Sequence, residues 1–444
     1  MRDAISHGAP IAIFTIGTQG DIRPCVALGV GLQRAGYPVR IVTSDNFEGM
    51  VRAAGLDFYP LTANFQTLLD SNREIADQGL DMSAMARISR RFYAEWATHW
   101  AREGMAAAEG AGLLIGVANS TLLAKAVSEA RGIPFVGAQL QPLTPSRFMP
   151  PLVLSGAGKL PPALNMTMYN VLRLLVWHVM KPAINNIVRP QLGLPRYPWY
   201  GPYFNNRQHR VLYGFSRHVV PRPADWPPTA QITGYWFLDQ PEWQPSQTLR
   251  EFLDAGSKPI YVGFGSMVST RAEQFTASVL DAVRRSGQRA VLATGWGGLA
   301  GNEGTQDGQL YFTRSVPHDW LFPRMSAAVH HGGAGTTAAA VRAGIPSVIV
   351  PFFGDQPFWA RCLQREGVAP AIVDRRNLQA EALAEAIDIA GKKPMCQAAV
   401  SLGQKVRAED GVEQAITSLR QWGLLEPLHD ERETREAWVH AAVT

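Results

Sequence analysis

The chain has 444 residues, 46% of them hydrophobic and 18% charged, and its formal net charge is +5. Such a length exceeds one ordinary hydrophobic core and predicts two domains of about 200 residues each. The three cysteines are far apart and odd in number, which argues against a disulfide framework and against a cysteine-based metal site.

Residues 1–10 lack an apolar core of signal-peptide length, and no stretch reaches the roughly 20 uninterrupted apolar residues that span a bilayer. The cysteine pattern favours a reducing compartment. We therefore expect a cytoplasmic protein.

In the first half, a continuous apolar run at 11–16 predicts a buried parallel strand, and a helix is predicted at 25–35, ending at Gly36. Further strands and helices alternate along this half, at 39–43, 84–109, 113–116, 135–138 and 164–192, the last interrupted at Pro182. This alternation predicts a parallel sheet with helices on both faces.

The turn after the opening strand, 17–21, has the sequence Gly-Thr-Gln-Gly-Asp. A dinucleotide-binding dehydrogenase would place Gly-x-Gly-x-x-Gly here, but the spacing differs and Asp21 would repel a pyrophosphate. A carboxylate at a strand end facing a cleft is suited to accept a proton. Alternatively, Asp21 caps the following helix, with Arg23 and Pro24 in its first turn, and both roles can hold together.

No acidic residue lies between Glu129 and Asp225, whereas eleven Lys and Arg residues do. The same block is rich in Leu, Val, Met, Phe and Trp, and this combination suits an anionic membrane surface, where each basic residue contributes about 1 kcal/mol. The alternative is that the basic residues belong to ordinary loops and the apolar ones to the core. Nucleic acid is disfavoured because the aromatic residues do not interleave with the basic ones in a recognisable module. We expect contact with the inner face of a membrane.

The second half repeats the alternation, with strands predicted at 259–263, 290–293, 309–312, 327–329 and 347–350. The segment 234–245 is aromatic and contains Pro, with few regular signals, so a domain boundary is expected there. We predict domains at 1–240 and 241–413, followed by a helical segment at 414–444.

The run His-His-Gly-Gly-Ala-Gly-Thr-Thr at 330–337 lies where a strand turns into a helix. Small residues let backbone N–H groups and the positive helix end face a phosphate, with His331 adding a donor or a positive charge. The candidate phosphate-binding residues are His331, Gly333, Ala334, Gly335 and Thr336, together with Ser266 after an earlier strand. The alternatives are an ordinary Gly-rich turn and, for His330, a core histidine.

After the next strand come Asp355 and Gln356, whose carboxylate and amide groups suit the hydroxyls of a sugar. Trp296 lies between two glycines past another strand and is a candidate for lining the nucleotide cleft, although it can equally pack under its own turn.

These motifs resemble the donor-binding signature of family 1 glycosyltransferases, most closely the sterol 3-beta-glucosyltransferase branch. The resemblance extends in order over nearly the whole chain, through 17–24 (GTQGDIRP), 212–216 (LYGFS), 220–227 (VPRPADWP), 233–237 (TGYWF), 262–267 (VGFGSM) and 316–321 (VPHDWL).

The resemblance implies the GT-B fold, two Rossmann-like parallel-sheet domains facing a central cleft, in which 414–444 crosses back to the N-terminal domain. It implies inverting transfer, with Asp21 in place of the His that many members use as general base. Val316 and His318 match the nucleobase-binding element, with His318 replacing the usual Gln. Ala339 stands where plant members hold the ribose with Glu, so the choice between UDP and dTDP stays open.

The run Asp374-Arg375-Arg376 is not the Asp-x-Asp that carries a divalent cation in the other large glycosyltransferase fold. Because a helix end with His331 can stabilise a departing diphosphate, we expect an enzyme that needs no metal and no cofactor beyond its nucleotide sugar.

The resulting hypothesis is a hexosyltransferase that moves glucose, or a related hexose, from UDP-glucose to a hydroxyl of an apolar acceptor such as a sterol. Candidates for the acceptor pocket are Phe65, Phe92, Trp96, Leu140 and Phe148. The alternatives are a flavonoid, macrolide or hydroxy fatty acid acceptor, a dTDP-sugar donor, a nucleotide-sugar epimerase and a non-catalytic lipid adaptor.

Overall fold

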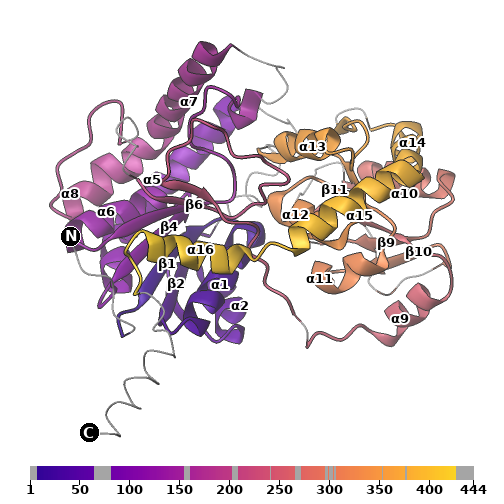
Figure 1. Cartoon of the computed structure of the whole chain (residues 1–444), viewed down its shortest axis with the longest axis horizontal. Coiled ribbons are helices and arrows are strands. Elements are labelled where there is room, and N and C mark those ends of the chain that lie inside the picture. Colours follow the sequence, from indigo (N-terminus) through magenta and orange to yellow (C-terminus); the bar gives the residue numbers. More distant parts are fainter. Residues whose placement is uncertain are drawn as a thin grey trace, which may run out of the picture.

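The computed structural model describes residues 8–64, 82–154, 161–202, 209–240, 242–265, 272–295, 299, 304, 307–352, 354–375 and 378–426. Within these residues the chain forms two parallel sheets, each covered by helices, which lie side by side (Figure 1). The predicted pair of parallel-sheet units is confirmed.

The first sheet has the strand order β3-β2-β1-β4-β5-β6-β7 and is parallel throughout. Its strands are β1 (Ile11–Ile16), β2 (Val39–Thr43), β3 (Asp57–Pro60), β4 (Leu113–Ala118), β5 (Phe135–Gln139), β6 (Val211–Tyr213) and β7 (Ala230–Ile232). Alternate residues of β1 enter different cores, Ile11 and Ile13 on one face and Ala12 and Phe14 on the other. A strand buried on both faces explains why 11–16 is apolar at nearly every position.

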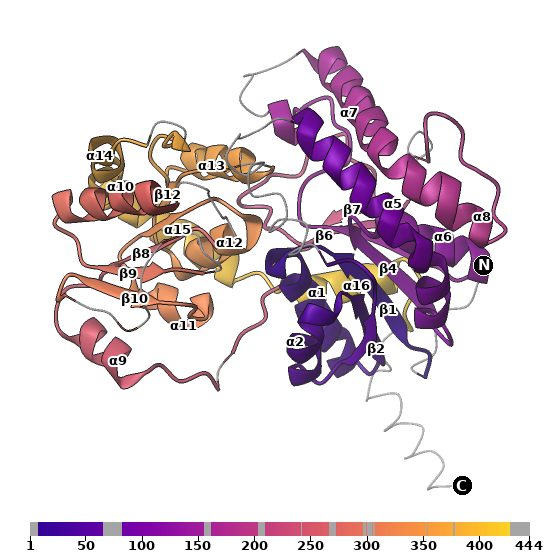
Figure 2. The same ribbon diagram turned by 180° about the vertical axis from the view of Figure 1, so that it is seen from behind.

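The helical segments of this half are α1 (Gln19–Arg34), η1 (Asp45–Phe47), α2 (Glu48–Ala53), α5 (Met82–Ala107), α6 (Thr121–Arg131), η2 (Leu152–Leu154), α7 (Pro162–Ala183), the π-helical η3 (Ile184–Val188) and α8 (Arg189–Gln191). Figure 2 shows α5, α6 and α7 together on one side of the sheet, and α1 and α2 lie across it.

The second sheet has the order β10-β9-β8-β11-β12, again all parallel. Its strands are β8 (Ile260–Gly263), β9 (Ala290–Ala293), β10 (Leu310–Thr313), β11 (Ala328–His330) and β12 (Ser347–Ile349). The helical segments are α9 (Gln247–Asp254), α10 (Ala272–Arg285), α11 (His318–Leu321), η5 (Phe322–Arg324), α12 (Ala334–Ala343), α13 (Gln356–Arg365), α14 (Ala380–Ala390), α15 (Lys393–Arg407) and α16 (Gly411–Gln421).

The chain passes between the two halves twice, after β7 through 233–246 and after α15 through 408–410. Helix α16 packs against α1, and its Ala415, Ile416 and Leu419 enter the core of the first sheet (Figure 1). The two crossings touch, because Gly234, with φ +107°, has its β-carbon position 3.0 Å from the Cα of Gly411.

Two ion pairs lie along the first crossing. Arg23 of α1 donates to the carbonyl of Leu238 at 2.7 Å and lies 3.6 Å from Asp319 of α11. Arg342 of α12 makes two hydrogen bonds to the carboxylate of Asp239, one of them 2.8 Å long. The crossing is therefore tied to helices of both halves.

The sequence prediction differed from the structure in three respects. Helix α1 begins at Gln19 rather than at 25, and Pro24 lies inside it as the sixth residue, where the helix loses one backbone hydrogen bond. The interruption predicted at Pro182 is a π-helical segment that keeps the chain helical. The strands β3, β6 and β7, of three or four residues each, were missed.

Candidate active site

The two turns that carry the main motifs face each other between the sheets. The turn at 17–20 follows β1, and the turn at 331–333 follows β11, so both lie at the carboxyl edges of their sheets. A β-carbon at Gly335, in the first turn of α12, would lie 4.0 Å from the Cα of Gly20. The structure therefore brings Asp21 and the Gly-rich turn, more than 300 residues apart in sequence, to opposite walls of one site.

Asp21 is the third residue of α1 and closes a capping box with Thr18. Its Oδ2 accepts from the Thr18 backbone N–H at 2.8 Å and from the Thr18 hydroxyl at 3.1 Å. A β-carbon at Gly17 would collide with this carboxylate, so glycine is required there. Both donors reach Oδ2, which leaves Oδ1, within the part of the chain that the structure describes, open to an incoming hydroxyl.

The pKa of Asp21 is raised to about 6. Burial is the main cause, the hydrogen bonds from Thr18 oppose it, and the negative charge of Asp355 adds to it. A carboxylate with this pKa is a stronger base than an ordinary Asp and is still ionised at neutral pH.

His331 lies over the N-terminus of α12. The helix has Gly333 as N-cap, no acidic residue in its first turn and no side chain bonded to its first N–H groups. A β-carbon at Gly333 would collide with the His331 ring, so the small residue lets the imidazole reach this position. Among the described residues, Nδ1 of His331 is buried without a hydrogen-bond partner, which marks a place for an external acceptor.

Burial lowers the pKa of His331 to about 4. The imidazole is thus uncharged at neutral pH in the unliganded protein. Of the two roles considered from the sequence, hydrogen-bond donor and positive charge, this favours the donor. The neighbouring His330 is fully buried and its Nδ1 accepts from the Gly332 N–H at 3.0 Å, which agrees with a core histidine that shapes the turn.

Asp355 is the N-cap of α13 and receives hydrogen bonds from both halves of the protein. Its Oδ2 accepts from Nε1 of Trp359 at 2.7 Å and from Nε2 of Gln141 at 3.1 Å. Burial raises the pKa of this carboxyl group, and the two hydrogen bonds oppose the rise. Gln141 follows β5 of the first sheet, and nothing in its local sequence predicts a contact 214 positions away.

Gln356 differs from its neighbour because it is 4% exposed. Its Oε1 accepts from the Phe352 N–H at 2.6 Å, so the side chain holds the backbone that leads to Asp355. That oxygen is engaged within the protein.

The two nucleobase candidates lie in a packed region. Val316 is buried in a cluster with Tyr261 and Phe322, which leaves its backbone for contact with a ligand. His318 stacks on Phe322 with ring centroids 4.4 Å apart, and its Nε2 lies 3.3 Å from the Tyr261 hydroxyl. Burial, with the charges of Arg23 and His331, lowers the pKa of His318 to about 3, so the ring is neutral.

The candidates for the acceptor pocket that the structure describes pack in different places. Phe92 and Trp96 of α5 contact each other with centroids 5.6 Å apart on one face of the first sheet. Leu140 belongs to the core on the other face, and Phe148 is 67% exposed at the surface. The amino-acid composition identified these residues as apolar but could not show on which face of the first sheet each one packs. Tyr93, which was missed, is close enough to Asp21 for the carboxylate charge to add to the burial that raises its pKa.

Phe65, Ser266 and Trp296 lie outside the described residues. Gly265, which precedes Ser266, packs against the His331 ring, since its β-carbon position is 3.3 Å from Cε1. The loops after β8 and β9 meet there too, because the β-carbon position of Gly295 is 2.5 Å from the Gly265 carbonyl oxygen. Among the residues that the structure describes, no group of His, Cys, Asp and Glu is arranged to hold a metal ion.

Comparison with known proteins agrees with this arrangement. Residues 11–150 match the profile of the glycosyltransferase family 28 N-terminal domain, and residues 308–418 match that of the erythromycin biosynthesis protein CIII-like C-terminal domain. A sterol 3-beta-glucosyltransferase of Arabidopsis thaliana is 33% identical over 415 residues, which cover 91% of this chain and 67% of that protein.

The chain belongs to the glycosyltransferase family of the sterol 3-beta-glucosyltransferases. A sterol 3-beta-glucosyltransferase of the fungus Leptosphaeria maculans is 34% identical over 92% of this chain, which spans only 28% of that longer relative. The solved structure of the kitacinnamycin glycotransferase superposes with a TM-score of 0.65 at 17% identity, covering 94% of this chain and 100% of that one. This glycosyltransferase therefore has the predicted GT-B fold, and its family uses nucleotide sugars as donors.

Proposed function

We propose that the protein transfers glucose from UDP-glucose to the hydroxyl of a sterol, with inversion at the anomeric carbon. The names of the relatives support the sterol acceptor, because they are sterol 3-beta-glucosyltransferases at 33 to 34% identity over more than nine-tenths of this chain. The observation that carries the proposal is the opposition of Asp21, a carboxylate poised as a base, to the uncapped N-terminus of α12 with His331 over it.

In this mechanism Oδ1 of Asp21 accepts the proton of the acceptor hydroxyl while the acceptor oxygen attacks the anomeric carbon. The bond from that carbon to the diphosphate oxygen breaks on the opposite side. The N–H groups at the start of α12 and the neutral His331 ring donate to the diphosphate as its charge grows. These donors replace a metal ion in the proposal.

Asp355 accepts hydrogen bonds from sugar hydroxyls, and Gln141 positions its carboxylate from the first domain. The Gln141 contact makes the sugar-binding carboxylate depend on the two domains being together. Gln356 supports the loop that presents Asp355, rather than contacting the sugar through its bonded oxygen.

Ser266 and Trp296 remain candidates for the phosphate and nucleoside, with the backbone of Val316 and the ring of His318 beside the base. A dTDP-sugar is the alternative donor. We also propose contact with an anionic membrane surface, where a sterol acceptor would reside. The described part of the chain contains no helix with the length and apolarity to cross a bilayer.

The test is incubation of the purified protein with radiolabelled UDP-glucose, with and without cholesterol in detergent micelles. We expect label in a sterol glucoside that has the β configuration at its anomeric carbon. Label in a different hexose of the donor pool without sterol would indicate an epimerase. Binding of UDP-glucose with no turnover on sterols, flavonoids, macrolides or hydroxy fatty acids would indicate a non-catalytic adaptor.

A further inference from the structure

Exposed apolar side chains are concentrated on one part of the first domain. Of ten large apolar side chains that are exposed among the described residues, nine lie between positions 143 and 200, and the tenth is Val400 in α15. Scattered exposed apolar residues are normal in soluble proteins, whereas a contiguous group marks an interaction site.

Helix α7 forms the centre of this group. Its inner face, with Asn165, Tyr169, Trp177 and Met180, is buried, and the helix packs against α5. Its outer face is mostly apolar, and the spacing of seven and four residues places Leu164, Val171 and Leu175 along one exposed stripe, 40%, 44% and 59% exposed. A helix that is apolar all round is expected in a core or against lipid, and here one side has no protein cover among the described residues.

Neighbouring segments that carry exposed apolar side chains lie against the inner face of α7 near both of its ends. Asn165 donates to the carbonyl of Arg147 at 2.8 Å, which places the exposed Phe148 beside the start of α7. Trp177 donates to the carbonyl of Trp199 at 2.9 Å, which places Trp199, 72% exposed, beside its second half. We call Phe148, Leu164, Val171, Leu175 and Trp199 the α7 surface.

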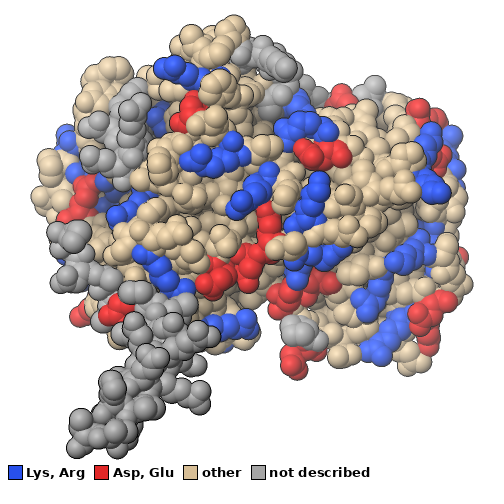
Figure 3. Space-filling view, viewed as in Figure 1, with Lys and Arg blue, Asp and Glu red and all other residues tan. Residues whose placement is uncertain are grey.

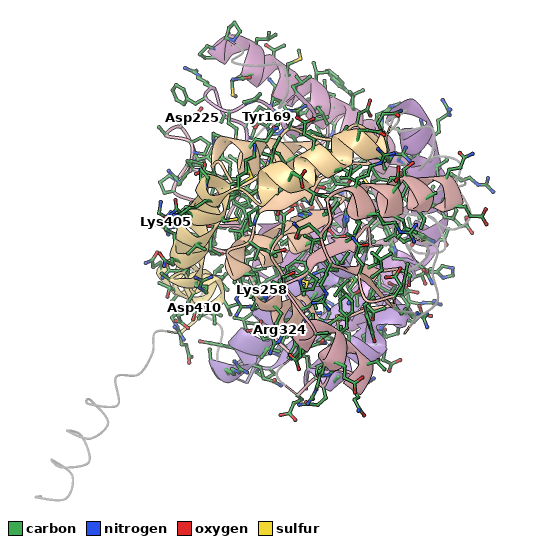
Figure 4. All side chains as sticks on the ribbon, turned by 90° about the vertical axis from the view of Figure 1, so that its right-hand side faces the viewer. Tyr169, Asp225, Lys258, Arg324, Lys405 and Asp410 are labelled. Carbon is green, nitrogen blue, oxygen red and sulfur yellow. The ribbon has the colours of Figure 1, made fainter. Side chains whose placement is uncertain are left out.

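Basic groups border the α7 surface. The exposed Arg147 lies at one end, and Arg90 of α5 makes a 3.0 Å contact with Nε2 of His178 on α7. The first acidic residue of this region, Asp225, is occupied, because its carboxylate accepts from the Ser146 hydroxyl and the Arg147 N–H, both at 2.7 Å. Figure 4 shows Asp225 near Tyr169, and Figure 3 shows mostly uncharged atoms over α7, with Lys and Arg and an acidic group beside them.

We infer that the α7 surface docks on an anionic phospholipid bilayer, with α7 parallel to the membrane plane. An apolar face bordered by cations matches acyl chains beneath anionic headgroups, and Trp199 is of the residue type that favours this interface. A second copy of the chain is a poorer partner for this surface. In a two-fold symmetric contact the basic residues of one copy would lie close to the same basic residues of the other and repel them.

This inference rests on the proposed sterol acceptor and adds a route for it. Helix α7 packs on α5, and α5 carries Tyr93, whose pKa responds to the charge of Asp21. The docked face is therefore separated from the catalytic carboxylate by one helix, α5.

The experiment compares sedimentation of the full chain with vesicles of phosphatidylcholine alone and with added phosphatidylserine. The double variant Val171→Ser, Leu175→Ser should bind vesicles that contain phosphatidylserine at least about tenfold more weakly, because each apolar side chain loses its burial in lipid. Val400→Ser is the matched control, since Val400 is 48% exposed on the other domain and should leave binding unchanged. Raising the salt concentration should weaken binding of the parent protein.

Transfer to cholesterol in detergent micelles is measured in parallel and should be unchanged in the double variant. Absent transfer in the parent protein would refute the proposed function, whatever the vesicle result. Parent-like vesicle binding by the double variant, or equal binding to neutral vesicles, would overturn the docking inference. The inference would also be overturned if light scattering showed that the parent protein is a dimer in solution and that the double variant is a monomer.

Discussion

The turns after β1 and β11 have the same architecture and opposite electrostatics. Each connects the end of a parallel strand to the N-terminus of a helix. In α1 the helix end is filled by the protein's own carboxylate, Asp21, bonded to Thr18. In α12 the residues at the helix end are Gly333, Ala334 and Gly335, which leave the N–H groups uncapped by side chains.

One local fold can therefore supply a base or an anion site, depending on the residues at the start of the helix. In α1 the carboxylate of Asp21 neutralises the helix end, whereas in α12 the small residues Gly333, Ala334 and Gly335 leave it exposed. Substrates that need both functions can then react between two such helix ends.

The largest effect is expected for Asp21→Asn. Asn can still accept from Thr18, so the helix start should survive, whereas loss of the base should reduce transfer about 10²–10⁴-fold. In the parent enzyme, kcat/KM should rise with pH through about 6 as Asp21 loses its proton, and this limb should vanish from the residual activity of the variant.

The midpoint of thermal unfolding (Tm) distinguishes the general-base role of Asp21 from its role in capping α1. A raised pKa in the folded state means that Asp21 favours folding below its unfolded pKa of 3.8 and that this contribution is lost as pH rises through about 6. Asp21→Asn should therefore match or exceed the parent Tm above pH 6. A variant that transfers at the parent rate would show that another group accepts the proton.

His331→Ala tests the other helix end. Removing the donor should cost about 2.7 to 4 kcal/mol of transition-state stabilisation, measured as kcat/KM with UDP-glucose, while the fold survives. His330→Ala is a useful contrast, because it removes the acceptor for the Gly332 N–H and should lower the Tm. Full turnover in His331→Ala would contradict a role at the diphosphate.

Asp355→Ala should raise the donor KM about 10- to 100-fold, the range for a hydrogen bond to a charged group. Calorimetry with free UDP should show nearly unchanged affinity, because UDP has no hexose for this carboxylate to hold. Gln141→Ala should also raise the donor KM, but by a smaller factor, because it removes only the hydrogen bond that supports Asp355 from the first domain. A Gln141→Ala effect on kcat alone would point to a contact with the acceptor instead.

The smallest effect on chemistry is expected for Gln356. Gln356→Ala leaves the Phe352 N–H buried without its acceptor and should destabilise the protein by about 1–3 kcal/mol, measured by denaturant unfolding. Gln356→Glu keeps an oxygen at this position and should recover most of that stability. Equal activity losses in both variants at parent-like stability would instead support direct sugar contact by Gln356.

The sequence predicted most of what periodicity and glycine spacing determine. The buried runs at 11–16 and 290–293 and the strand-to-helix turn at 330–337 coincide with elements of the structure. Gly333 was predicted as a small residue that lets a phosphate approach the backbone, and the structure adds that its small size makes room for the His331 ring.

Contacts that depend on the tertiary fold could not be predicted. Gln141 and Asp355 are 214 positions apart, and no local pattern links them. The pKa values of Asp21 and His331 follow from burial, which composition does not reveal. For the same reason Leu140 and Trp96 were assigned to one pocket although they pack on different faces of the first sheet.

The paired crossings at 233–246 and 408–410 constrain the residues that can stand where they meet. The two connections touch at Gly234 and Gly411, and a β-carbon at Gly411 would collide with the backbone of Gly234 and Tyr235. A side chain at position 411 would therefore push the two connections apart, and with them the domains that carry Asp21 and the start of α12.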